Sequence, residues 1–345
     1  MKKLLSLFLL LLYSASSFAC STFLLSGNGQ LLFGRNYDWV TGNGMVLVNA
    51  RGVQKTSFTP NREKGISWVS SCGSITFNQY GKEFPHGGMN EKGLVVELMW
   101  LSETVYPGAD NRGTLNELQW IQYQLDNCAT VEEVIATDRL LRINHQDAVP
   151  LHYLVADANG HAATIEFIKG KMVVHTGASL TKPVLTNTIY SEAITKIQSG
   201  SAPSGDNSLE RFATACRMVT DFQKTPTKEN GVDYAFRILD RVAQGDFTKW
   251  RIVYDIKARQ IHFITTGKRK QLALNDFDFR CTESSTYFNL EDQRGGTITP
   301  YFDILTFDKN KQLLQRSAAE SSSHVQISDA SIDRAAAYFT MVKCK

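Results

Sequence analysis

The sequence lacks a strong net charge of either sign. Its 345 residues contain 37 basic and 34 acidic side chains, which gives a formal net charge of +3 at pH 7. Proteins that bind nucleic acid usually carry a clustered basic excess, so we expect nucleic acid not to be a partner. The seven histidines show no zinc-helix spacing, and no two of the six cysteines are close enough for a metal pair. We therefore expect no metal site and no cofactor.

Long hydrophobic runs are absent beyond the first residues. Residues 1–19 begin with two lysines, continue through an apolar run at 4–12 and end on Ser17, Phe18 and Ala19. This pattern is typical of a secretory signal peptide. The run is too short for a transmembrane helix, and no later stretch reaches the roughly 18 apolar residues that such a helix needs. We expect a periplasmic or secreted protein without membrane contact after signal cleavage, in which residues 20–345 form a single domain.

Cysteine is scarce and widely spaced. An exported protein can form disulfides, yet the spacing predicts no particular pair. If Cys20 is set aside, five cysteines remain, so at least one is unpaired or bonds outside the chain. We expect most of them to be buried small apolar residues. They lie at positions 20, 72, 128, 216, 281 and 344.

Strand and helix patterns alternate in blocks along the chain. Strands are predicted at 20–26, 31–39, 45–51, 66–77, 93–101, 151–156, 162–167, 172–176, 184–189, 251–255 and 260–265. Helices are predicted at 115–127, 131–143, 208–222, 234–244 and, after an irregular tail, 331–341. Two serine-rich stretches, 199–208 and 317–323, are interpreted as surface loops. The block order favours stacked antiparallel sheets covered by helices, which is an α+β protein.

Cys20 would become the first residue if the leader is removed after Ala19. A thiol at a chain terminus has a candidate base beside it, because a free α-amine has a pKa of about 7.7 to 8.0. The thiolate is the nucleophilic form, and a nearby arginine would lower the thiol pKa. This combination predicts a cysteine nucleophile that needs no histidine.

The sequence places such an arginine near Cys20. If Asn28 and Gly29 form a two-residue type I′ turn, the hairpin register sets Cys20 opposite Tyr37. Arg35 then lies on the same face as Tyr37, about 7 to 8 Å diagonally from Cys20. Asp38 has the opposite parity, but its carboxylate could bind the terminal amine at the strand end. An exposed ion pair between Arg35 and Asp38 is the alternative interpretation.

Five segments together resemble the choloylglycine hydrolase family, which includes conjugated bile salt hydrolases and penicillin V acylases. They are Cys20, Phe33 to Asp38, Gly88 to Leu94, Val184 to Asn187 and Gly205 to Phe212. The resemblance implies the four-layer αββα fold of N-terminal nucleophile hydrolases and hydrolysis of linear amide C–N bonds in a small N-acyl amide. It also implies catalytic roles for Cys20, Arg35 and Asp38, for Asn187 in stabilising an oxyanion and for Arg211 as a second arginine.

One departure from the bile salt hydrolases concerns the substrate. Where those enzymes have a second oxyanion-hole asparagine, this chain has Met99 and Trp100, which offer no amide. With Tyr37 and Trp39, these residues predict an apolar and aromatic wall for the acyl group. The pattern resembles the penicillin V acylases of Gram-negative bacteria, some of which also accept N-acyl homoserine lactones. A bile salt hydrolase remains the alternative, and both tryptophans could also be core residues.

Other interpretations stay open at this point. A leader that ends before a cysteine is also typical of lipoproteins, so the chain could be a lipid-anchored ligand-binding protein acylated at Cys20. A papain-like hydrolase with an internal cysteine is disfavoured, because no internal cysteine lies in that family's local signature. The segment between Asn187 and Arg211 looks shorter than in tetrameric relatives, which leaves a homo-oligomer undecided.

Overall fold

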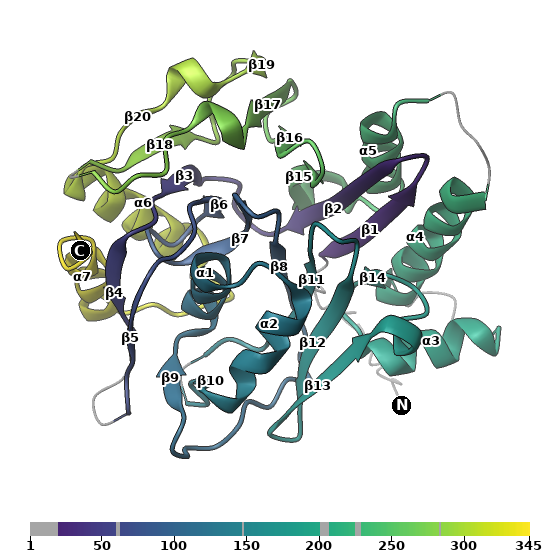
Figure 1. Ribbon diagram of the computed structural model, residues 1–345, viewed down its shortest axis with the longest axis horizontal. Coiled ribbons are helices and arrows are strands. Elements are labelled where there is room, and N and C mark those ends of the chain that lie inside the picture. Colours follow the sequence, from purple (N-terminus) through teal and green to yellow (C-terminus); the bar gives the residue numbers. More distant parts are fainter. Residues whose placement is uncertain (1–19, 60–62, 147, 201–206, 225–228, 283) are drawn as a thin grey trace, which may run out of the picture.

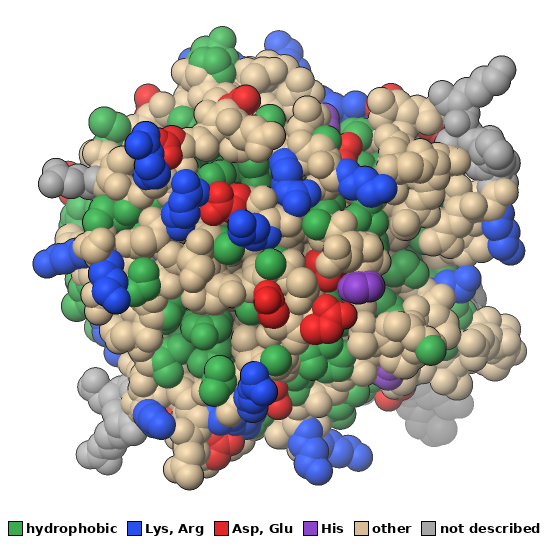
Figure 2. Space-filling model, viewed as in Figure 1, with side chains coloured by type: hydrophobic (Ala, Val, Ile, Leu, Met, Phe, Trp, Pro, Cys, Tyr) green, Lys and Arg blue, Asp and Glu red, His purple; other side chains and the backbone are tan. Residues whose placement is uncertain are grey.

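The computed structural model describes residues 20–59, 63–146, 148–200, 207–224, 229–282 and 284–345 (Figure 1). The predicted signal peptide, residues 1–19, lies outside this described part. Within it, no helix is long and apolar enough to cross a membrane. Lys and Arg side chains lie among Asp and Glu side chains on the face that Figure 2 shows, in keeping with the balanced charge of the sequence.

Two sheets contain most of the strands in the described part of the chain. The first sheet has the strand order β14-β1-β2-β15-β16-β17-β19, and the second has the order β13-β12-β11-β8-β7-β6-β3-β18-β20. The first sheet comprises β1 (Ser21–Gly27), β2 (Gln30–Asp38), β14 (Val184–Leu185), β15 (Thr248–Asp255), β16 (Gln260–Ile264), β17 (Arg269–Ala273) and β19 (Gly296–Thr297). The second comprises β3 (Met45–Asn49), β6 (Ser74–Asn78), β7 (Pro85–Asn90), β8 (Val95–Trp100), β11 (Leu151–Ala156), β12 (Ala162–Ile168), β13 (Lys171–Thr176), β18 (Thr286–Asn289) and β20 (Asp303–Ile304).

The two sheets pack face to face and helices cover their outer faces. Phe77 of the second sheet contacts the rings of Trp250, Tyr254 and Phe263 of the first, so aromatic side chains fill the space between the sheets. Helices α4 (Asn207–Lys224) and α5 (Gly231–Arg241) lie on the first sheet, and α1 (Glu117–Asn127) lies on the second (Figure 1). The layers therefore run helix, sheet, sheet, helix, which confirms the predicted α+β, four-layer αββα architecture.

Shorter elements surround these layers. A parallel pair joins β9 (Gly113–Leu115) to β10 (Leu141–Ile143), and a small sheet has the order β21-β4-β5. Its strands are β4 (Val53–Thr56), β5 (Ser67–Val69) and β21 (Lys343–Cys344). The other helices are α2 (Val131–Ala136), α3 (Tyr190–Gln198), α6 (Phe307–Glu320) and α7 (Asp329–Tyr338). Helices α6 and α7 pack against each other.

Several predicted elements are wrong in extent. The helix predicted at 131–143 ends at Ala136, because Leu141–Ile143 pairs with β9 instead. The strand predicted at 66–77 is split between two sheets around Gly73, where a Cβ would come within 2.2 Å of the Phe279 ring. The strand predicted at 184–189 ends at Leu185. Helices α3 and α6 and strand β7 were not predicted.

The serine-rich stretch 317–323 is not a surface loop. Ser317 lies in the last turn of α6, Ser321 is the C-cap residue of this helix, and both residues are fully buried. Their hydroxyl groups satisfy buried polar partners, which is why serine suits these positions although the composition indicates a loop. Much of the other serine-rich stretch lies at 201–206, outside the described residues, while Ser208 is part of α4.

Two cysteines form a disulfide that the spacing did not predict. Cys281 and Cys344 are bonded across a sequence separation of 63 residues, with their Cα atoms 5.7 Å apart. The strand β21 brings them together, because it pairs with β4 and places Cys344 opposite Val53. The other four cysteines are unpaired and buried, as the sequence led us to expect.

Candidate active site

The hairpin that begins at Cys20 has the predicted register. Asn28 and Gly29 both have positive φ angles, 52° and 78°, as a type I′ turn requires. Thr22 pairs with Arg35, and the same register extended by two residues sets Cys20 opposite Tyr37. An asparagine and a glycine occupy the turn because these residues tolerate left-handed backbone angles best. The turn fixes the register of the hairpin, and this register places Arg35 and Asp38 near Cys20.

Arg35 is fully buried and interacts with the Cys20 thiol. Burial raises the pKa of this thiol, whereas the positive charge of Arg35 and a hydrogen bond from it lower the pKa. A hydrogen bond from the backbone N–H of Asp38 acts in the same direction, but the Asp38 carboxylate raises the pKa. The site therefore provides groups that stabilise a thiolate against the cost of burial.

Arg35 is held in place by the second sheet. It forms an ion pair with Glu97 of β8, and both side chains are fully buried. It also donates a hydrogen bond to the carbonyl oxygen of His86 at 3.0 Å. The Tyr254 hydroxyl donates to Glu97 as well. The exposed Arg35–Asp38 ion pair considered above is therefore not what the structure contains, because Arg35 pairs with a buried glutamate.

Asp38 is buried with one oxygen unpartnered. Its Oδ1 accepts a hydrogen bond from the Thr248 hydroxyl, while Oδ2 has no hydrogen-bond partner in the described part of the chain. Burial raises the pKa of Asp38 to about 7, although Thr248, Arg211 and Arg35 oppose the rise. In the full-length sequence the nitrogen of Cys20 belongs to the peptide bond with Ala19 and carries no charge.

Asn187 and Arg211 come to Cys20 from the other side of β1. Thr22 pairs with Leu185 of β14, which ends two residues before Asn187. Arg211 donates hydrogen bonds of 2.6 Å to the Cys20 carbonyl oxygen and 3.0 Å to Oδ1 of Asn187. The Asn187 Nδ2 donates one hydrogen to the Trp100 carbonyl oxygen at 2.8 Å, which leaves its second N–H for another acceptor.

A cavity of about 530 Å³ opens beside Cys20. Its wall near the thiol is aromatic, since the Trp39 ring lies 6.4 Å from the Tyr37 ring and 6.5 Å from the Trp100 ring. Asp38 also lines this cavity, whereas Met99 does not. Met99 is fully buried in the core on the opposite face of β8, because side chains alternate along a strand, so it has no part in the wall.

Several residues that line or support this cavity were not predicted from the sequence. The far wall consists of α7 and the segment before it, including Val325, Ile327 and Ile332. Ser321 at the end of α6 accepts a hydrogen bond from Trp39 Nε1 at 3.0 Å, so the unpredicted helix α6 supports the aromatic wall. These contacts cross most of the sequence and left no local signal. Glu97 did leave one, because it is a lone acid in an apolar strand.

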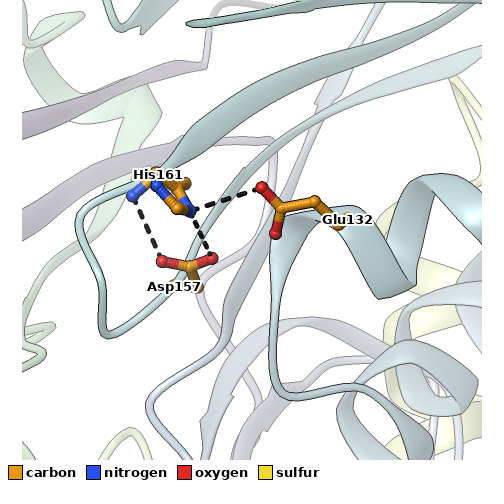
Figure 3. A group of neighbouring side chains, drawn as sticks. All are labelled: Glu132, Asp157 and His161. Atoms are coloured by element: carbon orange, nitrogen blue, oxygen red, sulfur yellow. Dashed lines mark hydrogen bonds and ion pairs between the residues drawn. The ribbon is translucent and has the colours of Figure 1, made fainter.

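A group of three side chains elsewhere has the composition of a metal site. Glu132, Asp157 and His161 lie together, with Nδ1 of His161 3.4 Å from Glu132 and 3.5 Å from Asp157 (Figure 3). However, Asp157 already accepts hydrogen bonds from the backbone N–H groups of Val131, Asn159 and His161. Its carboxylate therefore stabilises a turn and the first residue of α2, and the other two side chains are exposed.

The site and the fold define a class of protein. Residues 20–198, more than half of the chain, match the linear amide C–N hydrolases of the choloylglycine hydrolase family, and the chain belongs to that family. Its architecture is that of the N-terminal nucleophile hydrolases, as the solved relatives also indicate. Both the resemblance and the fold predicted from the sequence are therefore confirmed.

Individual relatives are similar over different shares of their length. A penicillin V acylase of Pectobacterium atrosepticum is 30% identical over 189 residues, and the match covers 50% of each chain. The structure of penicillin V acylase from Agrobacterium tumefaciens has a TM-score of 0.70 and 25% identity, covering 83% of this chain and 98% of that one. A mutant conjugated bile acid hydrolase from Clostridium perfringens has a TM-score of 0.66 and 16% identity, with coverages of 80% and 98%.

Proposed function

We propose that this chain hydrolyses N-acyl amides with an aromatic or long apolar acyl group, as a penicillin V acylase does, and that N-acyl homoserine lactones are among its substrates. Cys20 is the nucleophile once the chain begins there. The observation that carries this proposal is the position of the Cys20 thiol, which lies beside Arg35 and lines an aromatic cavity of about 530 Å³.

The proposed reaction begins with the free α-amine of Cys20, which takes the thiol proton. The sulfur attacks the amide carbonyl carbon, and the carbonyl oxygen becomes an oxyanion that the second N–H of Asn187 stabilises. The α-ammonium then protonates the leaving nitrogen as the C–N bond breaks. Water hydrolyses the resulting thioester with the amine acting as base again, which restores the thiol and releases the carboxylic acid.

The surrounding charges support these steps. Arg35 stabilises the thiolate, and the unpartnered Oδ2 of Asp38 is available to the α-ammonium once this exists. Arg211 orients Asn187 and the Cys20 backbone through the hydrogen bonds given above. General acid–base help of this kind contributes about 10²- to 10⁴-fold in rate, and one oxyanion donor about 10²- to 10³-fold.

Trp39 and Trp100 support the choice of acyl group. Flat aromatic rings bind aromatic or extended apolar chains by stacking and burial, whereas a hydroxylated steroid needs polar partners. The test compares kcat/KM of the mature protein for penicillin V, a long-chain N-acyl homoserine lactone and a taurine-conjugated bile salt. We expect the first two to exceed the bile salt. A bile salt turned over equally well would favour a conjugated bile salt hydrolase instead.

Export to the periplasm or the medium is part of the proposal. The signal-like residues 1–19 and the disulfide between Cys281 and Cys344 both suit an oxidising compartment. The competing function, a lipid-anchored binding protein, requires acylation at Cys20 and would remove the free amine. The intact mass of the exported protein decides between them. A mass equal to residues 20–345 with one disulfide supports the hydrolase, and added diacylglycerol mass supports the lipoprotein.

Substitution of the nucleophile provides the direct test of chemistry. Cys20→Ala should abolish turnover while leaving the fold intact, since the side chain is small and buried. Cys72→Ala is the matched control, because Cys72 is also buried and unpaired but does not line the cavity. Turnover in Cys20→Ala, or its loss in a folded Cys72→Ala, would contradict the assignment of Cys20.

A further inference from the structure

The loop that carries Asn187 is hydrogen-bonded to helix α4, which covers the first sheet, and to the second sheet. On the side of the first sheet, the Asn187 backbone N–H donates to the Ser208 hydroxyl at 3.0 Å. On the other side, His152 of β11 approaches from the second sheet, and its Nε2 lies 2.7 Å from the Thr186 carbonyl oxygen. Thr186 directly precedes Asn187. The contact made by His152 has no part in the proposed reaction steps.

Glu166 of β12 completes this connection. Its Oε1 lies 3.1 Å from Nδ1 of His152 and accepts a hydrogen bond from the Tyr190 backbone N–H at 3.0 Å. Tyr190 is the first residue of α3, so the two side chains together hold the chain just before and just after Asn187. Both side chains are fully buried. Through these contacts, His152 and Glu166 join the neighbouring strands β11 and β12 of the second sheet to the loop that follows β14 of the first sheet.

The chemistry of these partners determines where the hydrogens lie. A carbonyl oxygen only accepts, so Nε2 of His152 must carry a hydrogen and donate it to Thr186. Nδ1 of His152 and Oε1 of Glu166 then share one proton, and the pair has no net charge whichever atom holds it. Burying such groups costs free energy unless they are hydrogen-bonded, so both side chains are restricted to this geometry.

We propose that His152 and Glu166 are positioning residues for the oxyanion donor. They fix the Thr186 carbonyl group and the start of α3, and this keeps the Asn187 side chain at Cys20. The inference rests on the proposed function, in which Asn187 stabilises the oxyanion. A displacement of about 1 Å at a catalytic group can lower the rate about 10²-fold, so loss of the pair should lower kcat without weakening acyl binding in the cavity.

A double-mutant cycle tests whether His152 acts through Asn187. It compares kcat and KM of the mature wild type, His152→Phe, Asn187→Ala and the double variant, each corrected for folded protein. We expect His152→Phe to lower kcat about 10²-fold in the wild type, with KM within about 2-fold, and less than about 3-fold in the Asn187→Ala background. Equal losses in both backgrounds would overturn the inference, since a purely structural role acts independently of Asn187.

The same cycle separates this inference from the proposed function. A wild-type kcat in Asn187→Ala would show that Asn187 is not the oxyanion donor. Both the proposed role of Asn187 and the positioning role of His152 and Glu166 would then be refuted. A loss of about 10²-fold or more in Asn187→Ala, together with additive losses in the double variant, would leave the proposed function standing and refute only the positioning role of His152.

A second comparison uses the partner acid and does not depend on the folding of His152→Phe. In Glu166→Gln, an amide oxygen at the position of Oε1 can still accept from Tyr190, but a neutral His152 can then donate to this oxygen or to Thr186 and not to both. We expect Glu166→Gln, which keeps the Tyr190 contact, to lose about 10-fold in kcat and Glu166→Leu, which keeps neither contact, to lose about 10²-fold. Equal kcat values for the two variants would overturn the inference. His262→Gln, on β16 of the first sheet, is the control and should keep wild-type kcat.

Discussion

Removal of the disulfide between Cys281 and Cys344 should alter the cavity wall and leave the proposed catalytic side chains in place. The 63-residue separation spans α6, α7 and the segment between them. Val325, Ile327 and Ile332 of this region line the cavity. Cys20, Arg35, Asp38, Asn187 and Arg211 all lie outside the closed loop.

The size of the effect follows from the length of that loop. A cross-link over 63 residues lowers the conformational entropy of the unfolded chain, which raises the free energy of unfolding by about 4 kcal/mol in the chain-entropy description. The last strand would then depend on its pairing with β4, in which Lys343 lies opposite Gln54, and on the hydrogen bond from the Lys345 N–H to the Gly52 carbonyl oxygen. We therefore expect the variant with both Cys281→Ser and Cys344→Ser to lose about 4 kcal/mol of unfolding free energy and to bind apolar acyl groups more weakly.

Urea unfolding of the oxidised wild type and the double serine variant, without reductant, measures the first effect. Kinetics at a temperature where both are folded measures the second, and we expect KM to rise severalfold with kcat within about 2-fold. Cys72→Ser is the control for loss of a buried thiol. A stability loss below about 1 kcal/mol, or a fall in kcat at unchanged KM, would refute this reasoning.

Three further predictions concern the site. Trp100→Ala should raise KM for aromatic acyl substrates about 10-fold or more, because it removes a large contact surface; an unchanged KM would exclude Trp100 from the wall. Ser321→Ala removes the hydroxyl that accepts hydrogen bonds from the Trp39 indole N–H and the Tyr80 hydroxyl, and it should lower the unfolding free energy by about 1 to 3 kcal/mol in urea; a change below about 0.5 kcal/mol would contradict the role of these hydrogen bonds. Burial raises the pKa of Asp38 from 3.8 to about 7, so its ionisation opposes folding as the pH rises from 4 to 8. In a chain that retains residues before Cys20, Asp38→Asn should therefore raise the free energy of unfolding by up to about 4 kcal/mol more at pH 8 than at pH 4. Equal increases in urea unfolding at the two pH values would contradict the pKa shift. In the chain that begins at Cys20, the α-ammonium pairs with Asp38, and the increase should disappear.

The hairpin at Cys20 could be predicted because its determinants are local. Asn28 and Gly29 specify the turn, the turn specifies the register, and the register places Arg35 and Asp38 relative to Cys20. Asn187 and Arg211 were found through the family resemblance, since no local pattern indicates that they would meet. Their contacts depend on how β14 and α4 pack against β1.

The C-terminal part of the site could not be read in the same way. The sequence around α6 is polar and rich in serine, which is typical of a loop. Its serine hydroxyl groups are buried because they form hydrogen bonds with Trp39 and Asn43, which are distant in the sequence. The disulfide depends on a strand pairing between the first and last parts of the chain. The family resemblance places Met99 and Trp100 together at the position of a second oxyanion-hole asparagine, but side chains alternate along β8, so only Trp100 lines the cavity and Met99 lies in the core.

The measurement that tests the central claim most directly compares amidase activity in forms that differ only at the N-terminus. One form begins at Cys20, and the other retains one residue before it, with both termini verified by mass spectrometry. The added residue converts a titratable amine into an amide that cannot act as the base. We expect activity to fall by about 10²- to 10⁴-fold while the unfolding free energy changes little. Full activity in the extended form would show that Cys20 does not act as an N-terminal nucleophile.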